Sequence, residues 1–107
     1  MDDDAIFTVR LVEARDIKAM DITGSSDPYA VLKFGNQQQK SNYVKNDLNP
    51  VWNEVFTFDV VTGKEKLQVT IYDKDDFGSD DFEGQFTVSL DGLKDQGQHD
   101  IWFDLEA

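Results

Sequence analysis

Short stretches in which apolar and polar residues alternate recur along this chain, and this two-residue period constrains the fold more than any other feature. The stretches cover residues 7–11, 30–34, 56–60, 67–71, 86–90 and 101–105. One apolar and one polar face is what a half-buried strand of an antiparallel sheet requires. A seventh, more polar strand is expected over residues 38–44, paired across the Gly35-Asn36 turn with the strand that ends at Phe34.

Turn-forming residues separate the alternating stretches, as in Thr23-Gly24-Ser25-Ser26 and Phe77-Gly78-Ser79. No run of ten or more residues holds a convincing helical period. Short strands with regular turns predict an all-β fold, an antiparallel β-sandwich or barrel. The length of 107 residues predicts a single domain over residues 1–107, of the kind that can be excised from a longer protein.

The formal net charge of −12, from 22 acidic and 10 basic residues, excludes some partners. Nucleic acids are bound by neutralising phosphates with Lys and Arg, so no nucleic-acid partner is expected. An anionic membrane should also repel this chain unless something cancels the charge locally. With no Cys, a single His and no arrangement of a nucleophile and a base, the sequence predicts no enzyme. The lack of cysteine, of an apolar stretch near ~20 residues and of a signal peptide favours a cytoplasmic location.

The acidic residues concentrate in two loops, one over residues 20–28 and the other over residues 73–81. Counted along the chain, the first loop follows strand one and the second follows strand five. Both loops should therefore open at the same end of the sandwich, where about five carboxylates would converge without enough cations. Calcium resolves such repulsion because it takes 6–8 oxygen ligands in flexible geometry, whereas magnesium demands a stricter octahedron. The scarcity of Cys and His argues against zinc, copper and iron.

An EF-hand is the obvious alternative for the second loop. Counted from Asp73, the loop has Asp at positions one and three and Gly at position six, as an EF-hand requires. However, Phe77 stands at position five, and Gly84 stands at position twelve where a bidentate Glu is needed. No helices flank the loop, so the EF-hand interpretation fails.

Several motifs together carry a resemblance that covers nearly the whole chain. Their order along the sequence is Leu11-Val12-Glu13-Ala14-Arg15-Asp16-Ile17, Met20-Asp21, Gly24-Ser25-Ser26-Asp27-Pro28-Tyr29-Ala30, Leu48-Asn49-Pro50-Val51-Trp52-Asn53-Glu54, Tyr72-Asp73-Lys74-Asp75 and Asp80-Asp81-Phe82-Glu83-Gly84. In this order and spacing the chain resembles a C2 domain. The family implies an eight-stranded Greek-key β-sandwich whose loops at one end bind two or three calcium ions and then engage phospholipid.

The resemblance also implies roles for individual residues. The side-chain ligands would be Asp21, Asp27, Asp73, Asp75 and Asp81, and backbone carbonyls would come from Met20 and Lys74. Asp76 and Asp80 are interpreted as solvated acids. Glu83 stands where the family usually has an aliphatic residue, so the start of that strand is expected to be more exposed than usual. Only seven strands are evident, which leaves open a missed strand or a sheet edge that something else covers.

Two apolar residues, Ile22 and Phe77, lie at the tips of the acidic loops and are interpreted as membrane-inserting side chains. Lys40 and Lys45 are candidate contacts to lipid headgroups, in a region where the family can have a polybasic groove, although this region is richer in amides than in charge. The leading hypothesis is therefore calcium-dependent binding of anionic phospholipid. The alternative is a protein-interaction module that calcium stabilises.

Overall fold

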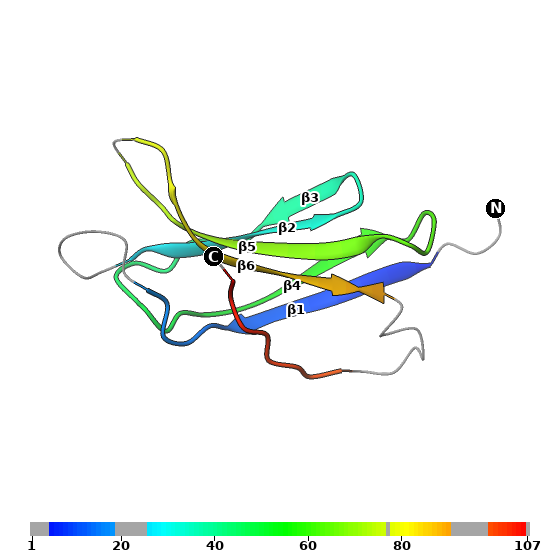
Figure 1. The fold of residues 1–107 in the computed structure, drawn as a ribbon, viewed down its shortest axis with the longest axis horizontal. Coiled ribbons are helices and arrows are strands. Elements are labelled where there is room, and N and C mark those ends of the chain that lie inside the picture. The colour runs from blue at the N-terminus through cyan, green and yellow to red at the C-terminus, as the bar shows by residue number, and fades with distance from the viewer. Residues whose placement is uncertain (1–4, 19–25, 77, 91–98, 107) are drawn as a thin grey trace.

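The computed structural model describes residues 5–18, 26–76, 78–90 and 99–106 (Figure 1). These ranges form six strands: β1 Ile6–Glu13, β2 Pro28–Phe34, β3 Gln37–Lys40, β4 Val51–Asp59, β5 Lys66–Asp73 and β6 Asp81–Ser89. Among the described residues, no helix is long and apolar enough to cross a membrane.

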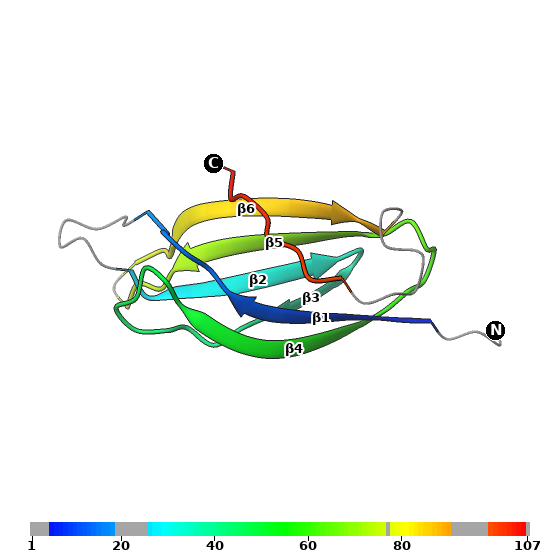
Figure 2. The same cartoon turned by 90° about the horizontal axis from the view of Figure 1, so that it is seen from below.

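The strands form two antiparallel sheets. One sheet has four strands in the order β3-β2-β5-β6, and the other pairs β1 with β4. The two views of the ribbon show the β1-β4 pair packed against one face of the larger sheet (Figures 1 and 2). The prediction of an antiparallel β-sandwich is thereby confirmed, as is the pairing of β2 with β3 across the Gly35-Asn36 turn. Gly35 has a φ of 60°, the left-handed conformation that such a tight turn requires.

The core lies between the sheets and follows the predicted alternation. In β2, Ala30, Leu32 and Phe34 are all 0% exposed, while the residues between them lie on the outer face. The Phe34 ring packs against Phe58 of β4 with a centroid distance of 5.4 Å. Burial of the Leu32, Phe34 and Phe58 side chains contributes roughly 1.5–3 kcal/mol each, which holds the two sheets together.

Two predicted strands differ from the structure: one is shorter than expected and one is absent, so that the described residues contain six strands rather than seven to eight. The strand expected over residues 38–44 is β3, and it ends at Lys40. Residues 101–105 do not form a strand; the C-terminal segment makes one isolated bridge, between Gln85 and Glu106. Its Phe103 still stacks on Phe86 of β6, at 4.6 Å between ring centroids. Alternation indicates which face of a segment turns inward, but a strand also needs a neighbouring backbone to pair with.

Two glutamine side chains of β3 join the two sheets at one side of the sandwich. Gln37 accepts a hydrogen bond from the backbone N–H of Asp59 and donates one to the Asp59 carbonyl, both at 2.8 Å. Gln39 donates to the carbonyl of Thr57 at 2.7 Å. Asp59 and Thr57 belong to β4, whose other edge pairs with β1. The amides therefore satisfy backbone groups on the edge of β4 that faces away from β1.

Candidate metal centre

Three acid-bearing strand ends lie side by side at one end of the larger sheet. β2 begins just after Asp27, β5 ends at Asp73, and β6 begins at Asp81. In the register of the sheet, Pro28 pairs with Asp73, and Asp73 pairs with Asp81. Figure 2 shows these strand ends at the same end of the molecule. The described flanks of the two acidic loops thus meet, as the strand count predicted.

Backbone hydrogen bonds fix Asp27 and Asp73 relative to each other. The N–H of Asp27 donates to Oδ1 of Asp73 at 2.9 Å, and the Lys74 N–H donates to the Asp27 carbonyl at 3.1 Å. Oδ1 of Asp27 accepts a further bond from the N–H of Asn46 at 2.8 Å. Asp73 is only 7% exposed, although it lies at the end of its strand. A carboxylate has about four lone-pair positions, so an N–H partner leaves it capable of binding a cation as well.

Asp80 differs from the solvated acid that was expected. Its Oδ2 accepts a short hydrogen bond from the Tyr29 hydroxyl, and its Oδ1 accepts the N–H of Asp75 at 2.8 Å. The bond from Tyr29 lowers the pKa of Asp80, and the Asp75 N–H and the charges of Lys74 and Lys40 add to this effect. Burial raises the pKa of Tyr29 to about 12, with a further contribution from its bond to Asp80. No local pattern could have indicated this contact, because Tyr29 and Asp80 are 51 residues apart.

A shallow groove of about 200 Å³ runs beside this acidic end. Its lining comes from Tyr29, Lys40, Ser41, Asn42, Tyr43, Lys74 and Asp80. The Lys74 ammonium lies 5.7 Å from the centre of the Tyr43 ring, within range of a cation–π contact. Lys40 therefore reaches the groove, whereas Lys45 is exposed outside it. Because Asp80 also lines the groove, its carboxylate offsets part of the positive charge there.

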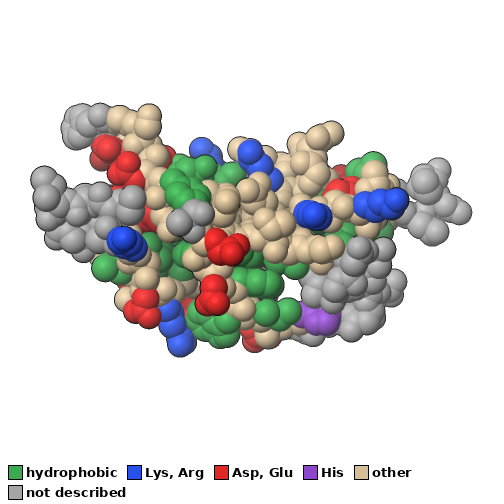
Figure 3. Space-filling model, in the orientation of Figure 1, with side chains coloured by type: hydrophobic (Ala, Val, Ile, Leu, Met, Phe, Trp, Pro, Cys, Tyr) green, Lys and Arg blue, Asp and Glu red, His purple; other side chains and the backbone are tan. Residues whose placement is uncertain are grey.

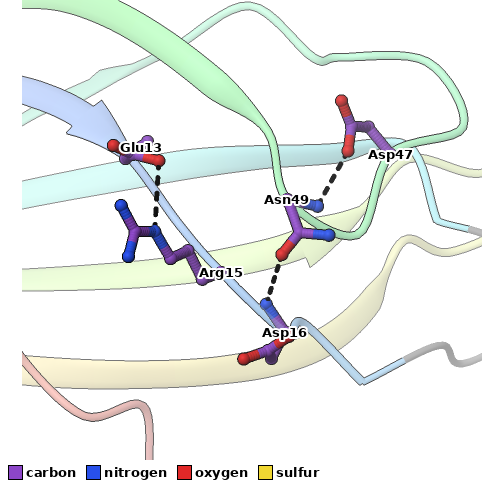
Figure 4. A network of polar contacts seen from close by, with 5 residues as sticks. All are labelled: Glu13, Arg15, Asp16, Asp47 and Asn49. Carbon is purple, nitrogen blue, oxygen red and sulfur yellow. Dashed lines mark hydrogen bonds and ion pairs between the residues drawn. The ribbon is translucent and has the colours of Figure 1, made fainter.

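The segment that leads from β1 to the first acidic loop is anchored by Asn49 (Figure 4). Oδ1 of Asn49 accepts the N–H of Asp16 at 2.9 Å, and the N–H of Asn49 donates to Asp47 at 2.8 Å. Asp16 has a φ of 55°, and Arg15 pairs with Glu13 at 3.5 Å. The Asn49-Pro50 turn therefore has a structural role, which is to direct the chain toward the acidic end.

Acidic side chains gather where the loop between β5 and β6 projects from the molecule (Figure 3). Asp75 and Asp81 are exposed there. Four predicted site residues lie outside the described residues: Met20, Asp21, Ile22 and Phe77. Within the described ranges alone, no three Asp, Glu or His side chains are grouped closely enough to hold a metal ion. The groups that do meet at these strand ends carry carboxylate and carbonyl oxygens, and calcium takes both as ligands.

Comparison with known proteins identifies the family. The family model for the C2 domain matches residues 5–105. A C2 and GRAM domain-containing protein of Arabidopsis thaliana is 42% identical over 100 residues, which cover 91% of this chain and 10% of the relative. Extended synaptotagmin-3 of Xenopus tropicalis is 41% identical over 108 residues, covering 94% of this chain and 12% of the relative.

A solved structure of a pair of C2 domains of extended synaptotagmin 2, calcium bound, superimposes with a TM-score of 0.85. It is 31% identical to this chain and is matched over 96% of this chain and 40% of its own length. The chain spans about a tenth of the length of the curated relatives above. From its strand arrangement, its motifs and these matches, the chain belongs to the C2 domain family.

Proposed function

We propose that this C2 domain binds two or three calcium ions and thereby attaches to anionic phospholipid membranes. The proposed side-chain ligands are Asp21, Asp27, Asp73, Asp75 and Asp81, with backbone carbonyls from Met20 and Lys74. The observation that carries the proposal is the contact between the two loop flanks, in which the N–H of Asp27 binds the carboxylate of Asp73 at 2.9 Å. This contact supports a single oxygen-rich site that is built from both loops.

Electrostatics explains why membrane attachment would depend on calcium. The five proposed aspartates carry five negative charges, and the whole chain carries −12. Two calcium ions would bring four positive charges to this end and so remove most of the local repulsion from an anionic surface. Calcium keeps a flexible coordination shell, so oxygen atoms of lipid phosphates could complete it.

Apolar loop tips would add to the attachment. Ile22 and Phe77 are proposed to enter the lipid once calcium is bound, and each buried side chain would contribute about 1.5–3 kcal/mol. Lys40 and Lys45 are proposed as weaker headgroup contacts, each contributing about 1 kcal/mol if it reaches the surface. The domain would then move reversibly from the cytoplasm to the cytoplasmic face of a membrane. No catalytic step is assigned to it.

Vesicle co-sedimentation in calcium and in EGTA tests the proposal, with vesicles of phosphatidylcholine alone or mixed with phosphatidylserine. The wild-type chain should sediment only with the mixed vesicles and only in calcium. The double variant Asp73→Asn/Asp75→Asn should lose calcium affinity by about 100-fold or more, because it removes two charged ligands. Asp59→Asn/Asp100→Asn removes the same charge elsewhere, from exposed positions, and should behave as wild type.

Two further variants test the membrane contacts. Phe77→Ala should keep calcium affinity but weaken vesicle binding by about tenfold, since most of a buried ring is lost. Val61→Ala, at a side chain that is 77% exposed outside the acidic loops, is its control. Lys40→Ala and Lys45→Ala should weaken vesicle binding by about fivefold at most. If calorimetry detects calcium binding but no vesicle recruits the chain, membrane attachment is refuted and the protein-interaction function is supported.

A further inference from the structure

Glu83 is an extra residue in β6, and it lies two residues after the proposed ligand Asp81. In the register with β5, Tyr72 pairs with Phe82 and Ile71 pairs with Gly84, so Glu83 is inserted between two consecutive pairs. Such a β-bulge changes the direction of the side chain at that point. Gly84 follows the bulge with a φ of +147°, a conformation that favours glycine. It also leaves room for the C-terminal segment, because a Cβ there would lie 2.8 Å from Cβ of Leu105.

The Glu83 side chain reaches Ser26 across an intervening strand. The Ser26 hydroxyl lies 2.8 Å from both carboxylate oxygens of Glu83 and donates its hydrogen bond to them. Ser26 is only 1% exposed, which strengthens a bond to a charged acceptor. In the sheet, β5 separates β2 from β6. The bond therefore joins two acid-bearing segments that share no backbone hydrogen bonds with each other.

Ser26 passes this restraint on to Asp27, its neighbour in the chain. The Ser26 carbonyl accepts the N–H of Asp47 at 2.9 Å, so the residue is held by both its side chain and its backbone. The N–H of Asp27 is in turn bound by Asp73. Fixing Ser26 against Glu83 thus fixes Asp27 relative to Asp81 at the far side of β5.

A second contact holds the same segments together on the other face of the sheet. Tyr29 alternates with the buried Pro28 and Ala30, so its side chain lies on the outer face of β2, whereas the Ser26 side chain is buried. Tyr29 donates its hydrogen bond to Asp80, which directly precedes β6. Its ring also stacks on Tyr72 at 5.8 Å, and Tyr72 meets Phe82 at 6.3 Å. The acid-bearing ends of β2 and β6 are therefore joined on both faces of β5.

We propose that Glu83 is a positioning residue for the calcium site, acting through Ser26. The inference rests on the proposed function, since it concerns the same site. By holding Asp27 and Asp81 at a fixed separation before the ion arrives, the bond reduces the ordering that binding would otherwise require. The carboxylate of Glu83 acts as a hydrogen-bond acceptor in this role and does not itself bind the ion.

A double-mutant cycle measured by calcium titration calorimetry tests this role. The variants are Glu83→Ala, Ser26→Ala and the two combined, all titrated well below the unfolding temperature of the least stable one. Each single variant should bind calcium about tenfold more weakly, the usual cost of losing a group that orients a metal ligand. The combined variant should lose no more than either single variant, because both changes break the same bond.

Glu83→Gln separates positioning from charge. Glutamine keeps an acceptor oxygen for Ser26 but removes the negative charge, so its calcium affinity should stay within about threefold of wild type. As a control, Asp59→Asn removes one charge at the end of β4 that lies away from the proposed calcium site, and it should leave the affinity unchanged. Unfolding temperatures in EGTA show whether each variant is folded before calcium is added.

Three outcomes would overturn the role of Glu83 while leaving calcium binding itself intact. These are unchanged affinity in Glu83→Ala, additive losses in the combined variant, or a loss in Glu83→Gln as large as that in Glu83→Ala. The last outcome would mean that Glu83 acts by its charge or as a ligand. If the wild-type chain itself takes up no calcium, the proposed function fails and this inference fails with it.

Discussion

The carboxylates at the two ends of the four-stranded sheet have different surroundings. Just before β5, Glu65 accepts four hydrogen bonds from the turn that precedes the strand: from the N–H groups of Val61, Thr62 and Gly63 and from the Thr62 hydroxyl. At the other end of β5, Asp73 lies beside Asp27 and Asp81.

The difference concerns what kind of partner each group of charges needs. Peptide N–H groups are dipoles without net charge, and a few of them stabilise one carboxylate well. Although burial acts to raise the pKa of Glu65, the N–H groups of Thr62 and Val61 lower it to about 2. Several carboxylates in one place repel each other, and dipoles that fix their positions do not cancel that repulsion. The carboxylate of Glu65 has hydrogen-bond partners enough for one charge, whereas in the proposed function calcium supplies the positive charge at the acidic end.

The largest expected effect is a rise in unfolding temperature on adding calcium, which should depend on the acidic end and not on Glu65. At a concentration 100 times its dissociation constant, a ligand of the folded state adds about 2.7 kcal/mol to stability. For a domain of this size that corresponds to a rise of roughly 10 °C or more in unfolding temperature. Calorimetric melts in EGTA and in calcium should show this rise in the wild type and in Glu65→Gln. Its presence in Asp73→Asn/Asp75→Asn would contradict the assignment of the acidic end.

Replacing Glu65 should have the next largest effect, and that effect should depend on pH rather than on calcium. Its pKa of about 2 in the folded chain lies below the ordinary value of 4.5, so its contribution is present above pH 4.5. The contribution is lost as the pH falls from 4.5 toward 2. Glu65→Gln should therefore melt at a lower temperature than wild type at pH 7, and the two curves should converge at acid pH. A difference that stays constant between pH 7 and pH 2 would contradict this account.

Tyr29→Phe should have a smaller effect, because it removes one hydrogen bond at the acidic end, from a carboxylate that already has its own donors. The expected cost is about 1 kcal/mol, or a few degrees in unfolding temperature at pH 7. The pKa of Tyr29 is raised to about 12, so the bond contributes below pH 10 and is lost as the pH rises toward 12. Ultraviolet titration should find the ionisation of Tyr29 near pH 12 in wild type, and this step should be lost in Tyr29→Phe.

The sequence predicts most of what local alternation controls. Residues 30–34 and 67–71 form parts of β2 and β5 with the expected faces buried, because one side chain in two points into the core. The same reasoning was wrong for residues 101–105, where the apolar residues alternate but the only backbone pairing among the described residues of this segment is the bridge at Glu106. Strand formation there depends on a neighbouring edge, which no local pattern encodes.

Within the acidic end, the meeting of the two loop flanks follows from strand counting, but their connections do not. The bond between Ser26 and Glu83 spans 57 residues and depends on a bulge that shifts β6 by one position. The sequence predicts Asp80 as a solvated acid, whereas in the structure it accepts a hydrogen bond from the Tyr29 hydroxyl. Carboxylate counts lead to the prediction of a cation site, while the contacts that hold those carboxylates in place are found only in the folded chain.

The glutamine amides on β3 have a consequence for how these molecules behave in a crowded solution. An uncovered sheet edge is a template on which another extended chain can pair and begin aggregation. Such a chain would use the N–H of Asp59 and the carbonyls of Asp59 and Thr57 on the edge of β4. The side chains of Gln37 and Gln39 already bind these groups. Two uncharged side chains thus protect this edge without adding to a net charge that is already −12. Replacing them with alanine should show first as slow clouding of a concentrated sample, before any change in binding.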